Sequence, residues 1–366
     1  MNNSINSNYK IQLEILSPLS IGSGEENWKR GIDYIVKDDK LYKLNYKRII
    51  ENNLLSPQQL SSYLSSYKTD SIQSAINNHI EAVSDLILEY PHGCDDYNGI
   101  KPFIRNNFSG NPIVPGSSIK GAIRSILFGS VIKKDDSIRR NKAKEMENEV
   151  FGTINKDIMR FLKVSDIDFQ HTKLINTKIF NLHSIIGNGY SGGWKHGNNK
   201  TERTFRQNGF NSIYEVLGIG EKGIGTLMLP KGQITQKYVD LSDINNLFEI
   251  INAHTYNYIE KEIHFFEKYH GDNYEKIINF LIDIGNDTID DNSFCIFRMS
   301  AGSGFNSITG DWQQDSFDID YIKPGRITRG FYNNTQSSKS RKIAISGNKF
   351  MPMGFVKMSI MNNNVE

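Results

Sequence analysis

The chain has 366 residues, of which 38% are hydrophobic and 11% aromatic, which is enough to bury a core and argues against an intrinsically disordered protein. Its formal net charge is +2, and its two cysteines lie far apart in sequence, which indicates neither a disulfide framework nor a zinc site. The polar N-terminus and the lack of a long apolar stretch argue against a signal peptide or a membrane span, so we expect a cytoplasmic protein without a membrane partner.

The basic residues are concentrated in two segments. Residues 101–144 hold ten Lys or Arg and only two acids, Asp135 and Asp136. Residues 321–349 hold seven Lys or Arg and no acid, whereas acids gather in 260–291. This segregation predicts a basic face that binds a polyanion, although surface charges also cluster by chance.

Strands and helices are both predicted in the first part of the chain. Residues 10–16 alternate polar and apolar like a half-buried strand, and residues 32–36 and 40–44 form a strand pair about a turn. Ser56 followed by Pro57 starts a helix. A further amphipathic helix is predicted from the apolar residues Ile72, Ala75, Ile76, Ile80, Val83 and Ile87.

The rest of the chain continues this mixture. Ser117 or Ser118 caps a helix, and helical periodicity runs through residues 241–284. Residues 187–211 are rich in Gly, Asn and charge and predict a long functional or mobile loop. Short strands are predicted at 161–165, 173–180, 212–217, 224–229, 294–299 and 354–360. This order favours an α+β fold with antiparallel sheets over a doubly wound parallel sheet.

The sharpest motif is the segment that begins with Pro115 and Gly116. A turn is followed by serines that can cap a helix, where backbone N–H groups and the positive helix end favour phosphate. Lys120 and Arg124 share one face of this helix, and Gly121 allows a close approach of a neighbour or an RNA backbone. The alternative is a well-capped surface helix that carries two solvated cations.

Two other glycine-rich segments follow predicted strands. Gly22, Ser23 and Gly24 come after the first strand, and small residues there let a second backbone or a phosphate approach closely, although a plain tight turn fits equally well. Residues 302–304 (Gly-Ser-Gly) follow a strand in which Arg298 is predicted on the face opposite to Phe297.

A basic segment with aromatic residues lies at 193–210. Its aromatics can stack on unpaired bases while its cations follow phosphates, as in an RNA-contacting finger or a subunit contact. Alternatively, the aromatics anchor an exposed loop to the core. The residues concerned are Trp194, Phe205 and Phe210 with Lys195, Lys200, Arg203 and Arg206.

Taken together, residues 16–24, 114–124, 298–305 and 353–357 resemble the CRISPR-associated RAMP superfamily. Their order and spread are similar to those of the type III-A (Csm) subunit at the 3′ end of the guide RNA. The family often has a glycine soon after the arginine of the third segment, where this chain has Ser300-Ala301.

The resemblance implies two ferredoxin-like (RRM-like) RAMP domains with antiparallel sheets, glycine-rich loops and helical insertions. We place an N-terminal domain with a helical insertion and the basic loop at 1–210, and a C-terminal domain with a glycine-rich loop at 211–366. It also implies a non-catalytic subunit that binds the guide RNA (crRNA) beside other RAMP subunits, especially the repeating backbone subunit. A part in crRNA maturation and antiviral defence, by recruiting or positioning host nucleases, is implied as well.

From the motifs and the resemblance we predict a set of RNA-binding residues spread along the chain. These residues are Gly22, Ser23, Gly24, Gly116, Ser117, Ser118, Lys120, Arg124, Lys195, Arg203, Arg206, Arg298, Gly302, Ser303 and Gly304.

Enzyme functions have weaker support in the sequence. Two G-x-G-x-x-G matches, which begin at Gly187 and Gly218, open no predicted helix and therefore do not fit a dinucleotide fingerprint. The histidines show no zinc-binding spacing, so we expect neither a metal nor a cofactor. The main alternative is a metal-independent endoribonuclease that processes guide RNA with His183 or His196 as general base. A protein scaffold that touches no RNA is a third possibility.

Overall fold

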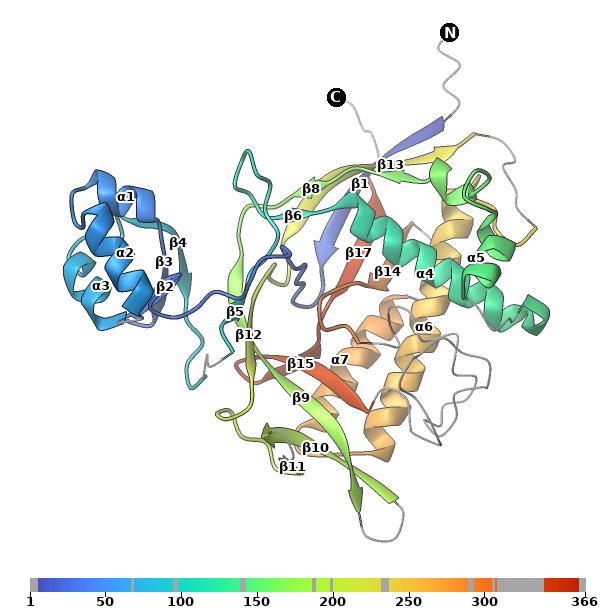
Figure 1. Cartoon of the computed structure of the whole chain (residues 1–366). Coiled ribbons are helices and arrows are strands. Elements are labelled where there is room, and N and C mark those ends of the chain that lie inside the picture. The colour runs from blue at the N-terminus through green and yellow to red at the C-terminus, as the bar shows by residue number, and fades with distance from the viewer. Residues whose placement is uncertain are drawn as a thin grey trace.

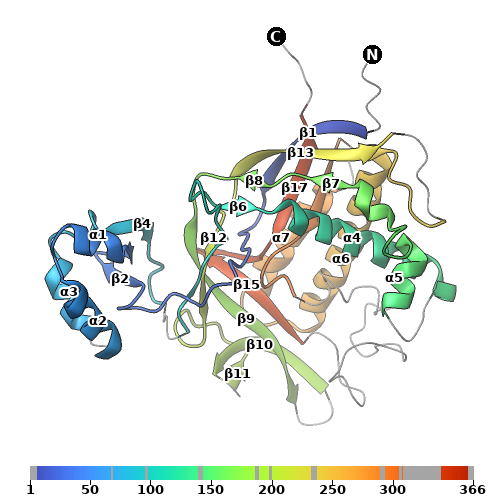
Figure 2. The same ribbon diagram turned by 45° about the horizontal axis from the view of Figure 1, so that its top comes forward.

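Two mainly antiparallel sheets, helices packed on them and a small lobe make up most of the described part of the chain. The computed structural model describes residues 6–66, 69–94, 98–138, 143–185, 189–197, 200–231, 237–288, 293–304, 307 and 339–361. Figure 1 shows the lobe standing to one side of a larger body that holds both sheets, and Figure 2 shows the same separation after a rotation.

The first sheet has five strands in the order β14-β17-β1-β13-β7, and all its pairings are antiparallel. Its central strand, β1, pairs along nearly its whole length with β13. Ile11, Leu13 and Ile15 of β1 alternate with polar residues and are fully buried, because one face of the strand lies against the core. The strands are β1 (Asn6–Ile15), β7 (Lys163–Val164), β13 (Lys222–Pro230), β14 (Phe294–Arg298) and β17 (Phe355–Ile360).

Helices α4 (Gly116–Lys134) and α6 (Ile244–Lys268) share the main hydrophobic core with this first sheet. The buried face of α4 recurs at helical spacing, with Ile119, Ile123 and Ile126 packed in this core. Shorter elements complete the core beside α4. These are β6 (Ile113–Val114), η1 (Asp136–Ile138), α5 (Ala143–Phe151), η2 (Ile158–Phe161) and β8 (Ile167–Asp168).

The second sheet is built around the long strand β9 (Lys173–Ile185). One of its faces packs on α6 and α7 (Tyr274–Asp287) through an aromatic core in which Phe180, Trp194 and Phe266 are buried. Its pairings are antiparallel except that of β12 with β5. The other strands are β5 (Ile100–Lys101), β10 (Gly189–Gly197), β11 (Lys200–Glu202), β12 (Ser212–Val216), β15 (Ser340–Ser346) and β16 (Lys349–Pro352).

The small lobe is an insertion between Trp28 and Ile100, whose backbones bond to each other at 2.8 and 2.9 Å. A three-stranded sheet and three helices surround a core of their own. The elements are β2 (Tyr34–Lys37), β3 (Lys40–Leu44), α1 (Tyr46–Glu51), α2 (Pro57–Ser66), α3 (Thr69–Ile76) and β4 (Ser84–Glu89).

The predicted α+β class with antiparallel sheets is confirmed, with the single parallel pairing of β12 and β5 as the exception. The turn of the first hairpin is also confirmed, because Asp38 and Asp39 both adopt positive φ, at 48° and 57°. Ser56 caps α2 as predicted, since its Oγ accepts from Gln59 N at 3.2 Å while Gln59 Oε1 accepts from Ser56 N at 2.9 Å.

Two element predictions are wrong. The helix predicted through Ile87 ends at Ile76, because residues 84–89 pair with β3 as strand β4. The segment 187–211 is not one long loop, because strands β10 and β11 occupy much of its described part. Each of the two sheets takes strands from both sides of residues 210 and 211, and the division into residues 1–210 and 211–366 stays a prediction.

Among the helices that the structure describes, none is long and apolar enough to cross a membrane.

Candidate nucleic-acid interface

The three glycine-rich segments, far apart in sequence, meet at one place. The Ala301 N–H donates to Ser20 O at 2.7 Å, and Ser300 Oγ accepts from Ser20 N at 3.1 Å. The Gly354 N–H donates to Pro18 O at 3.0 Å. These bonds join the loop after β1 to the loops that follow β14 and precede β17, at the same end of these three strands of the first sheet.

A cavity of ≈ 400 Å³ lies where these loops face the first turns of α4. Its lining consists mostly of small and hydroxyl side chains. The lining residues are Ser20, Ile21, Gly22, Ser118, Gly121, Ala122, Ser125, Arg298, Met299, Ser300, Ala301 and Ser307. We call this the loop cavity. It contains residues from all three predicted segments, so the structure brings those segments together.

The N-terminus of α4 differs from the prediction. Pro115 is the N-cap, and no side chain caps the helix, so the predicted capping by Ser117 or Ser118 is wrong. The Gly116 N–H instead donates to Asp166 Oδ1 at 2.8 Å, which places a carboxylate at the positive helix end. Gly116 is required there, because a Cβ atom on it would lie 2.0 Å from Val164 O.

The two cations of α4 have different surroundings. Arg124 donates to Asp157 at 2.9 Å and to Glu147 at 3.3 Å, and it stacks over Phe151 at 4.2 Å. It therefore ties α4 to α5 and η2 and is not a free cation of the loop cavity. Lys120 is half-buried and forms no ion pair within the described residues, so its charge is available to an incoming anion.

Gly121 and Gly22 line the loop cavity without a packing reason of their own. A Cβ atom on either residue would meet nothing within 4 Å. Gly121 is exposed in the interior of α4, where glycine costs about 1 kcal/mol relative to alanine.

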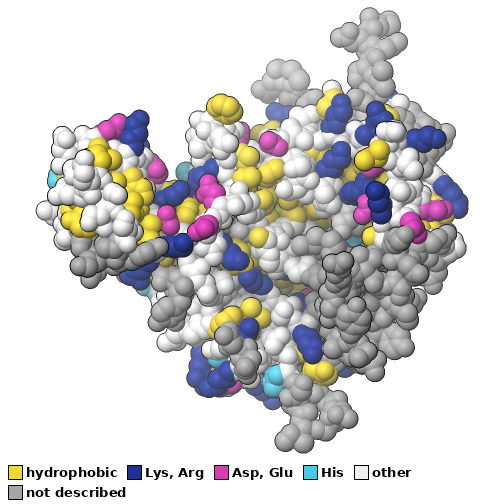
Figure 3. All heavy atoms as spheres, viewed as in Figure 1, with side chains coloured by type: hydrophobic (Ala, Val, Ile, Leu, Met, Phe, Trp, Pro, Cys, Tyr) yellow, Lys and Arg dark blue, Asp and Glu magenta, His cyan; other side chains and the backbone are white. Residues whose placement is uncertain are grey.

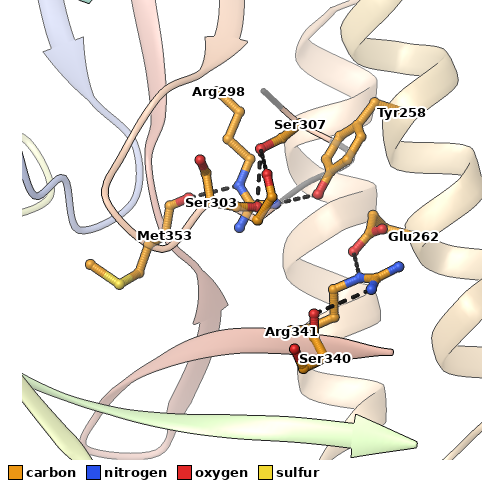
Figure 4. A network of polar contacts seen from close by, with 9 residues as sticks. Tyr258, Glu262, Arg298, Ser303, Ser307, Ser340, Arg341 and Met353 are labelled. Atoms are coloured by element: carbon orange, nitrogen blue, oxygen red, sulfur yellow. Dashed lines mark hydrogen bonds and ion pairs between the residues drawn. The ribbon is translucent and has the colours of Figure 1, made fainter. Parts of the chain in front are cut away.

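Arg298 is a buried cation at the wall of the loop cavity and is 6% exposed. Its Nε donates to Met353 O at 2.7 Å, its Nη1 donates to the Tyr258 hydroxyl, and its guanidinium lies 5.5 Å from the Phe355 ring centroid. Figure 4 shows this group between the β14 loop and α6, near the separate pair of Arg341 and Glu262.

No carboxylate lies within ion-pair distance of Arg298 in the described part of the chain. A buried charge without a counter-charge is costly, and an anion in the loop cavity would compensate it. Burial also raises the pKa of Tyr258, so the hydroxyl beside the guanidinium stays neutral.

The predicted alternation along β14 is confirmed, because Phe297 belongs to the core of the first sheet and Ile296 to the core of the second.

The glycines of the predicted loops hold unusual backbone conformations. Gly24, Gly302 and Gly304 have φ of 82°, 103° and 88°, which favour glycine. The hydroxyls between them are used within the loops: Ser303 Oγ donates to Ser300 O at 2.8 Å, and Ser23 Oγ accepts from Glu25 N at 3.1 Å. Ser303 is buried and therefore shapes its loop.

The basic segment 193–210 lies on the second sheet, and its residues do not line the loop cavity. Trp194 is fully buried and its Nε1 donates to Asp272 O at 2.9 Å, while Phe205 packs against it with centroids 5.0 Å apart. These two aromatics anchor the segment to the core, as the simpler interpretation predicted.

The cations of this segment are partly engaged within the fold. Lys195 stacks over Phe210 at 4.3 Å, and Arg206 pairs with Glu202 at 2.8 Å. Arg203 is exposed. Figure 3 shows Lys and Arg side chains both here, at the lower end of the body, and over α4 and α5.

The two histidines considered as general bases also lie away from the loop cavity. His183 is on β9 opposite Ser191, and His196 Nε2 bonds to Thr204 O at 2.9 Å. The described residues contain no group of three or more His, Cys, Asp or Glu that could hold a metal ion.

Sequence reasoning missed several residues that line the loop cavity. Ser125 and Ala122 extend the face of Ser118 and Gly121 at helical spacing, and this run of small residues on one helix face is a signal that the sequence contains. Ser20 and Ser300 could not be found in this way, because only the tertiary fold brings them together.

A family model described as the RAMP superfamily matches residues 12–296. The protein named CRISPR system Cms protein Csm5 from Streptococcus thermophilus is 28% identical over 194 residues, which cover 46% of this chain and 54% of that protein. The protein of the same name from Methanocaldococcus jannaschii is 27% identical over 202 residues, which cover 46% of each chain. The chain thus spans about half the length of the curated relatives it matches.

One solved structure shares the fold over nearly the whole length. It is a chain of a cryo-EM structure of a Csm–crRNA–target RNA ternary complex in a type III-A CRISPR–Cas system. The TM-score is 0.65 at 18% sequence identity, and the match covers 96% of this chain and 100% of that chain.

Proposed function

The chain belongs to the RAMP superfamily, and we propose that it is a crRNA-binding subunit of a type III-A CRISPR (Csm) effector complex. In this proposal it holds the 3′ end of the guide RNA, does not cleave it, and contributes to crRNA maturation and antiviral defence. The observation that carries the proposal is the loop cavity, which residues of three glycine-rich segments line together with Arg298, a buried cation that forms no ion pair within the described residues.

The chemistry of the loop cavity suits the RNA backbone. A phosphate can approach Arg298 closely because Gly22 and Gly121, which line the same cavity, leave space in it. The hydroxyls of Ser118 and Ser125 can bond to phosphate oxygens or to ribose 2′-hydroxyls. Contacts of this kind position an RNA without reading its bases, as a subunit must do if it accepts any spacer sequence.

The similar proteins support the complex and the partners. Both curated relatives are named as proteins of a CRISPR system, and the similar solved chain comes from an assembly with crRNA and target RNA. We therefore propose that this chain assembles with other RAMP subunits, in particular the repeating backbone subunit, and that it positions host nucleases near the guide.

We also propose that the two sheets are the two ferredoxin-like domains of the family. In the first sheet, β1 lies between β17 and β13, and α4 and α6 share its core. In the second sheet, β9 is central and α6 and α7 cover one face.

The test is to purify the tagged chain with its complex from its native host and to sequence the bound RNA with its 3′ ends mapped. Repeat–spacer RNAs that are depleted or have altered 3′ ends in a Gly121→Trp variant, which fills the loop cavity, would support the proposal. The control is Gln58→Trp, since residue 58 is exposed on helix α2 and lies outside the loop cavity. Equal amounts of the same RNA species in wild type and both variants would refute the role of the loop cavity.

The non-catalytic part of the proposal has a separate test against the endoribonuclease alternative. We expect the purified chain to leave a labelled repeat RNA intact in the presence of a chelator. Cleavage that disappears in His183→Ala or His196→Ala would assign the chain to the ribonucleases instead.

A further inference from the structure

The second sheet has one face that α6 and α7 leave uncovered, and a tyrosine lies there between two lysines. Tyr214 on β12 is 2% exposed, and its ring centroid lies 5.1 Å from Lys101 Nζ and 4.5 Å from Lys342 Nζ. Lys101 is the direct neighbour of Tyr214 in the register of β5 and β12, and Lys342 Nζ donates to the Tyr214 hydroxyl. Lys342 comes from β15, so three strands contribute to this cluster.

This lysine pair has no counter-charge in the described part of the chain, where neither Lys101 nor Lys342 forms an ion pair. Glu215, the next residue along β12, lies on the opposite face of the strand, where Arg105 pairs with it and Phe103 N donates to it at 2.8 Å. Burial and the charge of Lys101 lower the pKa of Lys342 to about 8. The two cations therefore repel each other in a place shielded from water. An anion between them would reduce both the repulsion and the cost of burying the charges.

The lysine pair adjoins the loop cavity. A Cβ atom on Gly302 would lie 2.9 Å from Lys342 Cδ and 3.7 Å from Met353 Sδ. Met353 O accepts from Arg298 Nε at 2.7 Å. The loop of Gly302 and the segment of Met353 thus separate Arg298 on one side from Lys342 on the other. Figure 3 shows Lys and Arg side chains near the middle of this view, where β12 and β15 lie in Figure 1.

We propose that Lys101 and Lys342 form a second phosphate-binding position, which takes a backbone phosphate of the same RNA strand that occupies the loop cavity. The proposal rests on the proposed function, and it adds a site on the second sheet to the one on the first. The strand would pass over the loop of Gly302, where the missing side chain leaves room for the Lys342 stem beneath it.

The test uses the full chain and a labelled single-stranded repeat RNA, with binding measured at several salt concentrations. The variants are Lys101→Met and Lys342→Met, singly and together, which keep the side-chain bulk and remove the charge. The control is Lys276→Met, because Lys276 also stacks on an aromatic ring, Phe350 at 5.2 Å, but comes from α7 on the covered side of the sheet.

We expect the double variant to bind roughly tenfold more weakly or worse. The dependence of log affinity on log salt should be less steep by about 0.7 for each phosphate that the variant no longer binds. The control should keep the wild-type slope, and the melting temperature of the double variant should be equal to or above that of the wild type, because a repulsive pair is removed.

The outcomes separate this site from the proposed function. If the wild type binds RNA and the double variant binds it with the same affinity and slope, the lysine pair is not a phosphate site, while the proposed function stands. A lower melting temperature with an unchanged slope would assign the lysines a purely structural role. If the wild type binds no RNA, the proposed function fails and this site fails with it.

Discussion

Glycine residues in this chain serve two different purposes, and the structure separates them residue by residue. Gly116 and Gly354 are required by the fold, since a Cβ atom would lie 2.0 Å from Val164 O in the first case and 2.4 Å from Met299 O in the second. Gly121 and Gly22 have open space in the same position. Glycines of the first kind allow close contacts within the fold, whereas those of the second kind line the loop cavity and have open space beside them.

This difference predicts opposite effects on stability for two alanine substitutions. Gly121→Ala should raise the free energy of unfolding by up to about 1 kcal/mol, because alanine is the better helix former, while its methyl group weakens RNA retention. Gly354→Ala should lower stability by more than about 1 kcal/mol, because its φ of 92° and the close Met299 O both oppose a side chain. Denaturant unfolding measures both. If Gly121→Ala unfolded at a lower denaturant concentration than the wild type, α4 itself would need this glycine.

The buried Lys342 predicts a pH dependence of stability. Its pKa is lowered from 10.5 to about 8, with Lys101 as the charged neighbour, and Tyr214 beside it stays protonated because burial raises its pKa to about 12. Between these values the unfolded chain binds the proton that the folded chain has released, so stability should rise as pH increases from 8 to 10.5. The upper limit of the rise is about 3 kcal/mol.

Urea unfolding across this pH range, with Lys342→Met as the comparison, measures the effect. The wild type should gain stability relative to Lys342→Met as pH rises. Parallel stability curves for the two proteins would mean that Lys342 titrates as an exposed lysine.

At the scale of secondary-structure elements, a buried ion pair ties α6 to β15. Arg341 Nε donates to Glu262 Oε2 at 2.5 Å, with the two side chains 7% and 2% exposed, and the guanidinium lies 4.0 Å from the Phe265 ring centroid. We expect Glu262→Leu or Arg341→Leu alone to cost about 3–5 kcal/mol, because each leaves a buried charge unpaired.

The double substitution should cost far less than the sum of the two single ones, because it removes both charges together. Unfolding free energies of the four proteins form a double-mutant cycle that measures this. Additive losses would mean that each side chain acts through separate contacts.

The elements also show which structures local sequence can predict. The strand at 10–16 and the hairpin turn at Asp38 and Asp39 were predicted because their signals lie within a few residues. The segment 187–211 was misread because its glycines indicate a loop only when considered alone. In β10, Gly192 and Gly193 are required by other parts of the chain, since a Cβ atom would lie 1.8 Å from Tyr269 O and 2.4 Å from Glu202 O respectively.

In the candidate site, too, local features could be predicted from the sequence and long-range contacts could not. Its three segments were predicted because glycine and serine clusters are local signals. That Arg124 is engaged by Asp157 and Glu147, and that Lys342 joins Lys101, depends on contacts between residues far apart in sequence. Sequence therefore indicated which segments line the candidate site, but not which of the nearby cations form ion pairs within the described residues.

At the scale of the whole molecule, the small lobe and the body have separate cores. The lobe is inserted between Trp28 and Ile100, whose backbones are bonded to each other, and no lobe residue lines the loop cavity. The contact between the two parts is a smaller cluster that includes Tyr34, Leu88 and Ile213.

Replacing residues 31–97 by a short Gly-Ser linker should therefore give a folded chain that still retains RNA. The melting temperature should fall modestly, because the side chains of the small contact cluster become exposed. Circular dichroism and RNA retention are the measurements. A folded variant that has lost its RNA would mean that the lobe itself contacts the guide.

The loop cavity is central to the proposed function, because it would hold the 3′ end of a guide RNA. Ultraviolet crosslinking of the assembled complex, with the joined peptides and nucleotides identified together, tests this role most directly. We predict crosslinks from nucleotides near the 3′ end to peptides that contain residues 20–24, 117–125 and 298–304. Crosslinks that reach this chain only from other parts of the guide, or only outside these peptides, would contradict this role.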